Sequence, residues 1–212
     1  MRTSIVVRSL VAAAGVAIPL LAQAGSSVQT GAGALTATAQ VQFAITIPQV
    51  LYLRVGTGSA YPGTLASNPA IDSITFTPTV AQLAAGGPVA GVGGDLTGGV
   101  ETAAVIGNGG TVLLGASTPG AMNDGAAGDT INWSSITTAS TPFNTGTALP
   151  APVLANGASA NLTLNPVAKT VYEDAKWTYT YNLVAGNAPA AGNYGGATAA
   201  QNGLVTYTAS MP

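Results

Sequence analysis

The chain has 212 residues, with 5 Lys or Arg, 7 Asp or Glu, and no His or Cys. The missing residue types exclude a Ser-His-Asp triad, a cysteine nucleophile, a zinc site built on His or Cys, and any disulfide. Five basic residues are too few to follow a phosphate backbone, so nucleic acid is excluded as a partner.

Residues 1–24 have the pattern of a secretory signal peptide. Arg2 and Arg8 form a positive n-region, residues 10–21 form an apolar h-region, and residues 22–24 (Ala-Gln-Ala) offer a small-x-small cleavage site. An apolar run of about a dozen residues is short for a membrane span, which needs about 20. We therefore expect a secreted protein of the periplasm or the extracellular surface, with no membrane span after cleavage. An uncleaved anchor is the alternative.

The mature chain is expected to begin with a flexible tail, residues 25–33, followed by a single domain, residues 34–212. The strongest strand signal covers residues 35–47, where apolar side chains, among them Leu35, Val41 and Phe43, alternate with mainly polar ones. Successive side chains of a strand point to opposite faces. This segment is therefore predicted to be a strand with one buried and one solvent-facing side.

Short strands are also predicted along the rest of the chain. The 28 Gly and 13 Pro favour strands and turns, and no segment shows a capped helical period. Two long Gly-rich connections are expected at residues 84–110, which could hold a further edge strand, and at residues 185–202. About eight strands with little helix predict an all-β, antiparallel sandwich. The further strands are expected at residues 49–55, 71–77, 111–114, 130–137, 161–164, 176–184 and 203–209.

Acidic residues are the candidates for a metal site or an active site. Asp124 and Asp129 lie in a Gly-rich loop whose oxygen atoms could wrap calcium, but an ordinary turn explains them better. Glu173 and Asp174 are paired carboxylates, yet neighbours on a strand point to opposite faces, so we favour a solvated turn over a glycosidase pair. We therefore expect no enzyme activity, no metal and no cofactor.

Aromatic residues provide the alternative function. Trp133, Trp177, Tyr179 and Tyr181 could form a platform that stacks on sugar rings, although aromatics at every second position of a strand more often belong to a core. If they are exposed, the protein would be a secreted polysaccharide-binding β-sandwich module with a glycan as its partner.

The C-terminal sequence resembles the closing strands of bacterial fimbrial subunits. The matching features are residues 177–181 (Trp-Thr-Tyr-Thr-Tyr), the turn at residues 192–195 (Gly-Asn-Tyr-Gly) and the final segment, residues 203–210. The resemblance covers roughly the last 45 residues, the signal peptide and the alternating N-terminal segment. It implies an immunoglobulin-like β-sandwich with long Gly-rich loops, in which a neighbouring subunit's N-terminal extension supplies a missing strand.

On this resemblance, residues 28–39 would be the extension, and residues 203–209 the strand beside the gap. A complete, self-sufficient sandwich is the alternative. We predict an exported, non-enzymatic structural or adhesive protein of the fimbrial (pilus) type, and its few charges leave strand edges open to pairing. Its partners would be further copies or related subunits and a periplasmic chaperone. The residues expected at the strand-edge assembly site are Val28, Leu35, Val41, Phe43, Leu204 and Tyr207.

Overall fold

The computed structural model describes residues 26–57, 65–125 and 128–212. The chain divides into two units, Met1–Ile47 and Pro48–Pro212. The predicted signal peptide, residues 1–24, lies outside the described residues. Within the described part, no helix has the length and apolar character needed to cross a membrane.

The described part of the first unit, residues 26–47, contains no helix or strand, and all of its side chains are exposed. The predicted strand at residues 35–47 is therefore wrong. Alternating side chains suit a strand, but a strand is stabilised only when its N–H and C=O groups pair with a neighbour. No described strand of this chain pairs with the segment.

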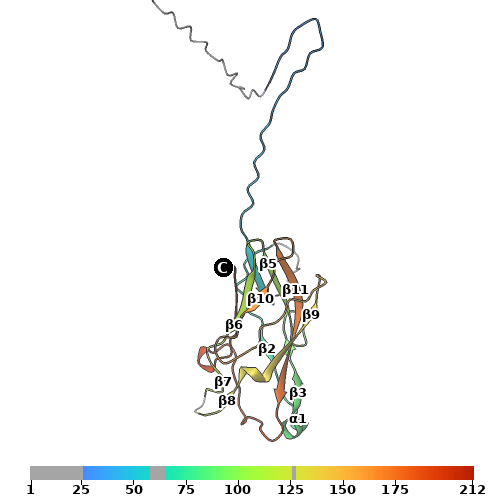
Figure 1. Ribbon diagram of the computed structural model, residues 1–212. Helices are drawn as coiled ribbons and strands as arrows, with labels where there is room; N and C mark the ends of the chain where they lie inside the picture. The colour runs from blue at the N-terminus through green and yellow to red at the C-terminus, as the bar shows by residue number, and fades with distance from the viewer. Residues whose placement is uncertain (1–25, 58–64, 126–127) are drawn as a thin grey trace, which may run out of the picture. The chain divides into compact units, whose positions relative to one another are not determined.

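The second unit is built on a five-stranded antiparallel sheet in which the 13-residue strand β11 is central (Figure 1). Along one edge β11 pairs first with β5 and then with β3, and along its other edge it pairs with β9. Strand β1 pairs with the far side of β5. The strands of this sheet are β1 (Leu51–Val55), β3 (Gly87–Ala90), β5 (Val100–Gly107), β9 (Ile136–Pro142) and β11 (Val171–Leu183).

A three-stranded antiparallel sheet has the order β10-β6-β12, and two further pairs of short strands, β2–β4 and β7–β8, complete the β structure. The remaining elements are one short helix, α1, and two 3-10 turns, η1 and η2. Their bounds are β2 (Ile74–Thr75), α1 (Val80–Ala85), β4 (Val92–Gly93), β6 (Val112–Ser117), β7 (Met122–Asn123), β8 (Thr130–Ile131), η1 (Trp133–Ser135), β10 (Leu162–Leu164), η2 (Ala199–Gln201) and β12 (Thr206–Ser210).

The core lies between the five-stranded and the three-stranded sheet. Val105 of β5 and Trp177 of β11 are fully buried, as are Val112 and Leu114 of β6. The Trp177 ring lies 5.3 Å from the ring of Tyr207 on β12, which joins the two sheets across the core. The predicted all-β class is confirmed.

The predicted connection at residues 84–110 is wrong, because it contains β3, β4 and β5. Strand β5 is buried on both faces, and small side chains such as Ala103 and Ala104, each 1% exposed, allow close packing there. A strand buried on both faces needs no alternation. The sequence pattern therefore carried no signal for this central strand.

Helix α1 was also not predicted, although its start is visible in the sequence. Thr79 and Gln82 form a capping box, in which each side chain satisfies the other residue's backbone N–H. The predicted strands at residues 49–55, 111–114, 161–164, 176–184 and 203–209 are found with shifted ends. The predicted strand at residues 71–77 is reduced to two residues, and the one at residues 130–137 is divided by η1.

Candidate functional site

Strand β12 forms an open edge of the three-stranded sheet. It pairs with β6, and no other described strand pairs with it. Its inward-facing side chains pack on the core yet are only half-buried, in contrast to the fully buried Val112 and Leu114 of the neighbouring β6. The core is therefore incompletely covered at this edge. The half-buried side chains are Val205, Tyr207, Ala209 and Met211.

Strand β1 of the other sheet lies beside β12 without pairing with it. Its residues Leu53 and Val55 also pack on the core and are half-buried. A Cβ placed on Gly107 of β5 would lie 3.0 Å from the sulfur of Met211, and Gly107 pairs with Leu51 at the start of β1. Both sheets thus present partly covered apolar side chains on this side of the core.

Tyr207, one of the predicted edge residues, anchors β12 to the core through its side chain. Its hydroxyl lies 2.9 Å from the hydroxyl of Tyr179 on β11. Burial raises the pKa of Tyr207 to about 12, since the phenolate would be desolvated. Tyr207 therefore holds the strand in place, and the backbone of the strand is the part that is open. Leu204, which precedes β12, is 47% exposed.

The other predicted edge residues all lie in the first unit, and all are exposed. Val28 is 88% exposed, Phe43 87%, Val41 74% and Leu35 51%. Ile45 and Ile47, which continue the same alternating set, are 87% and 77% exposed. Contiguous exposed apolar side chains commonly mark an interaction site.

The predicted aromatic platform is wrong, because its four rings belong to the core. Trp177 is fully buried and Trp133 is 5% exposed, and Tyr179 and Tyr181 are each 7% exposed. The indole N–H of Trp133 donates a hydrogen bond to the backbone carbonyl of Gly120, and the indole N–H of Trp177 donates one to the backbone carbonyl of Leu149, both at 2.9 Å. These rings are not available to stack on a sugar.

Asp174 is fully buried, so the predicted solvated turn is wrong for this residue. Its Oδ1 accepts hydrogen bonds from the backbone N–H of Asn144 and from the N–H and hydroxyl of Thr145, at 2.8–2.9 Å. Burial by itself would raise the pKa of Asp174, but these hydrogen bonds outweigh it and lower the pKa below its usual value. Asp174 is a structural anchor for the loop after β9.

Glu173 lines a surface pocket of about 430 Å³ together with Thr145, Thr170 and Tyr172. Burial raises the pKa of Glu173 above its ordinary value. Asp124 is half-buried and Asp129 is exposed. Neither belongs to the acidic cluster that Asp72, Asp95 and Glu101 form within the described residues.

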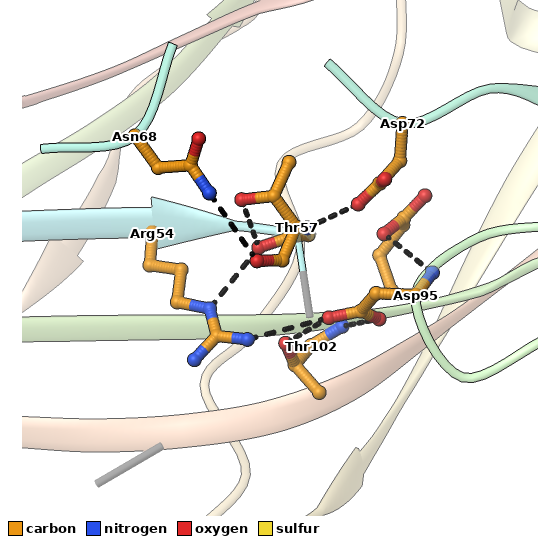
Figure 2. A network of polar contacts seen from close by, with 8 residues as sticks. Arg54, Thr57, Asn68, Asp72, Asp95 and Thr102 are labelled. Atoms are coloured by element: carbon orange, nitrogen blue, oxygen red, sulfur yellow. Dashed lines mark hydrogen bonds and ion pairs between the residues drawn. The ribbon is translucent and has the colours of Figure 1, made fainter. Parts of the chain in front are cut away.

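An acidic cluster that the sequence did not indicate lies at the end of β1. Asp72, Asp95 and Glu101 bring carboxylate oxygens within 4.8 Å of one another. Asp95 is held in place by Arg54, whose Nη2 is 3.4 Å from its Oδ2, and by the backbone N–H of Thr102 at 2.8 Å (Figure 2). These residues come from segments far apart in sequence, and two of them lie in the stretch predicted to be a connection.

Among the three acidic residues, Glu101 has the smallest exposed fraction of the whole residue, 5%. Its Oε2 accepts the backbone N–H of Asp95 at 3.2 Å. Asp72 is exposed and accepts the backbone N–H of Thr57, as Figure 2 shows. Burial raises the pKa of Glu101 to about 8, and the neighbouring carboxylates of Asp72 and Asp95 contribute to this shift.

Comparisons of the chain with family models, with curated proteins and with solved structures gave no significant match.

Proposed function

We propose that this chain is an exported structural subunit with an immunoglobulin-like β-sandwich, which assembles with further copies or related subunits by strand addition. In this proposal, the added strand is the alternating segment 35–47 of one copy, instead of the residues 28–39 that the fimbrial resemblance implied, and it pairs with the open edge of β12 in the next copy. The observation that carries the proposal is a complementary pair of features. One part of the chain has the alternation of a strand without a partner, and another part is a strand edge without a neighbour.

The side chains on the two surfaces are chemically matched. An added strand would direct one alternating set, which includes Val41, Phe43 and Ile45, towards the half-covered core beside β12. Its other set, which includes Gln40 and Gln42, would face solvent. Burial of a large apolar side chain contributes about 1.5–3 kcal/mol, so a few inserted residues give a stable contact.

Length and charge also favour pairing. Residues 35–47 would extend over about 40 Å at roughly 3.3 Å per residue, whereas the five-residue β12 needs less than half of that. Neither residues 26–47 nor β12 contains a charged side chain. Charged residues are a common means of keeping strand edges apart, so these surfaces have no electrostatic barrier to association. A periplasmic chaperone would protect the same edge before assembly.

Disulfide trapping tests this proposal directly, since the natural chain has no cysteine. Two single variants, Ala44→Cys and Thr208→Cys, are mixed, with one carrying a size tag; both positions belong to the sets that would face solvent, so their side chains would lie on the same face of the paired strands. We expect a mixed disulfide-linked dimer under mild oxidation. The matched control replaces Thr208→Cys with Thr163→Cys, which is on the exposed side of β10 at the opposite edge of the same sheet. Equal trapping at both edges, or none at β12, would contradict the proposal.

A second experiment separates the apolar from the polar set of the extension. Phe43→Asp places a charge in the set that would be buried, and Gln42→Asp places the same charge in the set that would face solvent. We expect Phe43→Asp to reduce the assembled mass measured by light scattering, and Gln42→Asp to leave it near the wild-type value. If both variants assemble like the wild type, residues 35–47 are not the added strand.

A further inference from the structure

The acidic cluster at the end of β1 carries more negative charge than the neighbouring base can balance. Asp72, Asp95 and Glu101 lie within 4.8 Å of one another, and Arg54 reaches Asp95 at 3.4 Å. Glu101 is almost fully enclosed, so its charged form would lose most of its hydration. Two adjacent carboxylates in such a place cannot both be ionised without a large cost.

The contacts within the cluster indicate where the compensating proton lies. Asp95 accepts hydrogen bonds from Thr102 and is paired with Arg54. The carboxylate oxygens of Asp72 and Glu101 lie within 4.8 Å of each other, and the neighbouring Asp72 contributes to the raised pKa of Glu101. Because an ionised carboxylate can only accept, a hydrogen bond between two carboxyls requires one proton.

The geometry around Gly56 brings these two carboxyls together. A Cβ added to Gly56 would lie 2.4 Å from Oε2 of Glu101 and 2.5 Å from Oδ2 of Asp72. Gly56 also has a φ of 72°, in the left-handed region that favours glycine. The turn after β1 therefore leaves space that the two carboxyl groups occupy together.

We propose that Asp72 and Glu101 share one proton, and that this proton latches the segment entering β2 onto the start of β5. Asp72 holds that segment through its bond from the N–H of Thr57, and the same segment continues into Ile74 and Phe76, which pack on the core. Loss of the proton places two negative charges against each other. The segment is then released, and the end of the core near Tyr181, whose ring lies 6.1 Å from that of Phe76, becomes less covered.

The titratable and charged groups that face Glu101 within the described residues come from five elements or segments. They are Asp72 and Asp95 in the segments before β2 and β5, Arg54 on β1 through its pairing with Asp95, Tyr179 on β11, and Tyr207 on β12. The two tyrosines are neutral at neutral pH, because burial raises both of their pKa values. The charge around Glu101 is therefore set by the carboxyl groups of Asp72 and Asp95 and by Arg54.

The direction of the pH effect follows from linkage. The pKa of Glu101 is raised from 4.5 to about 8, so its stabilising contribution is fully present below about pH 4.5 and is lost as the pH rises through 8. Over that window the unfolding equilibrium constant should rise up to about tenfold per pH unit for one proton. Above this window the latch is open.

NMR of protein labelled with ¹³C at the glutamate carboxyl tests the latch, since the chain has just two glutamates, Glu101 and Glu173. We expect the Glu101 signal, assigned with Glu173→Gln, to titrate near pH 8. The amide signals of Thr57 and of Gly94, which donates to Ser73, should move with the same midpoint. Asp72→Asn, at an exposed position, should lower the Glu101 midpoint, whereas the control Asp129→Asn should not move it.

Three results would overturn the latch. The first is a Glu101 midpoint in the ordinary range of a glutamate. The second is an unchanged midpoint in Asp72→Asn. The third is a titration that disappears on addition of calcium chloride, which would mean that a cation takes the place of the proton. Urea unfolding of Glu101→Gln adds an independent readout, and we expect its stability between pH 6 and pH 8 to change less than that of the wild type.

Discussion

The buried carbonyl of Leu149 makes a prediction that can be measured in a double-mutant cycle. This oxygen accepts two hydrogen bonds, one from the indole N–H of Trp177 at 2.9 Å and one from the hydroxyl of Ser140 at 2.6 Å. Leu149 and Trp177 are both fully buried. Either donor alone keeps the carbonyl satisfied, and the loss of both leaves it unpaired in the core.

The magnitudes follow from these contacts. Trp177→Phe loses about 2 kcal/mol of apolar burial, at roughly 0.8 kcal/mol for each CH₂-sized group. Ser140→Ala removes one hydrogen bond and costs about 1 kcal/mol. The double variant also leaves a buried carbonyl without a donor, which adds about 1–2 kcal/mol beyond the sum of the single costs.

Urea unfolding of the protein, followed by circular dichroism, gives the four free energies of unfolding that the cycle needs. Trp133 remains as a second probe in fluorescence. A coupling energy within about 0.5 kcal/mol of zero would refute the reasoning, because it would mean that the two donors act independently.

Three further predictions concern other buried groups and one turn. Asp174→Asn should cost about 2 kcal/mol at pH 7, because it removes charge-assisted hydrogen bonds. Since the pKa of Asp174 is lowered, this difference should shrink in acid unfolding experiments as the pH falls below 3.8, the usual pKa of an aspartate. Tyr207, with its pKa raised to about 12, should resist ionisation followed at 295 nm, and stability should fall as the pH rises from about 10, where the unfolded chain ionises, through 12. Gly94→Ala should destabilise the protein more than Gly98→Ala in thermal unfolding: both glycines have positive φ, but only the Cβ at position 94 meets a backbone oxygen, that of Val100 at 2.3 Å.

The sequence predicted strands best where one face is buried and the other is polar. In β11, Trp177, Tyr179, Tyr181 and Leu183 alternate with polar residues and are all buried, as the pattern indicated. Strand β5 could not be recognised in this way, because it is buried on both faces and its small side chains show no period. Residues 35–47 show the opposite case, in which a clear period occurs where the described chain supplies no partner.

The candidate sites differ in how far sequence could indicate them. The open edge of β12 follows from a final alternating strand, which was predicted, although its half-covered core could be seen only in the structure. The acidic cluster required the fold, because Asp72, Asp95 and Glu101 belong to three segments that meet only once β5 pairs with β1 and β11. Local sequence carries no information about such a meeting.

The pairing of Gly107 with both Leu51 and Val171 has a consequence for how this protein reaches its native state. Each of these contacts closes a loop of about 60 residues, and such non-local pairings slow folding. The central sheet cannot form until β11, near the end of the chain, is available. A newly synthesised molecule therefore passes through an interval in which many strand edges are open to mispairing, and the speed of folding sets how long that hazard lasts.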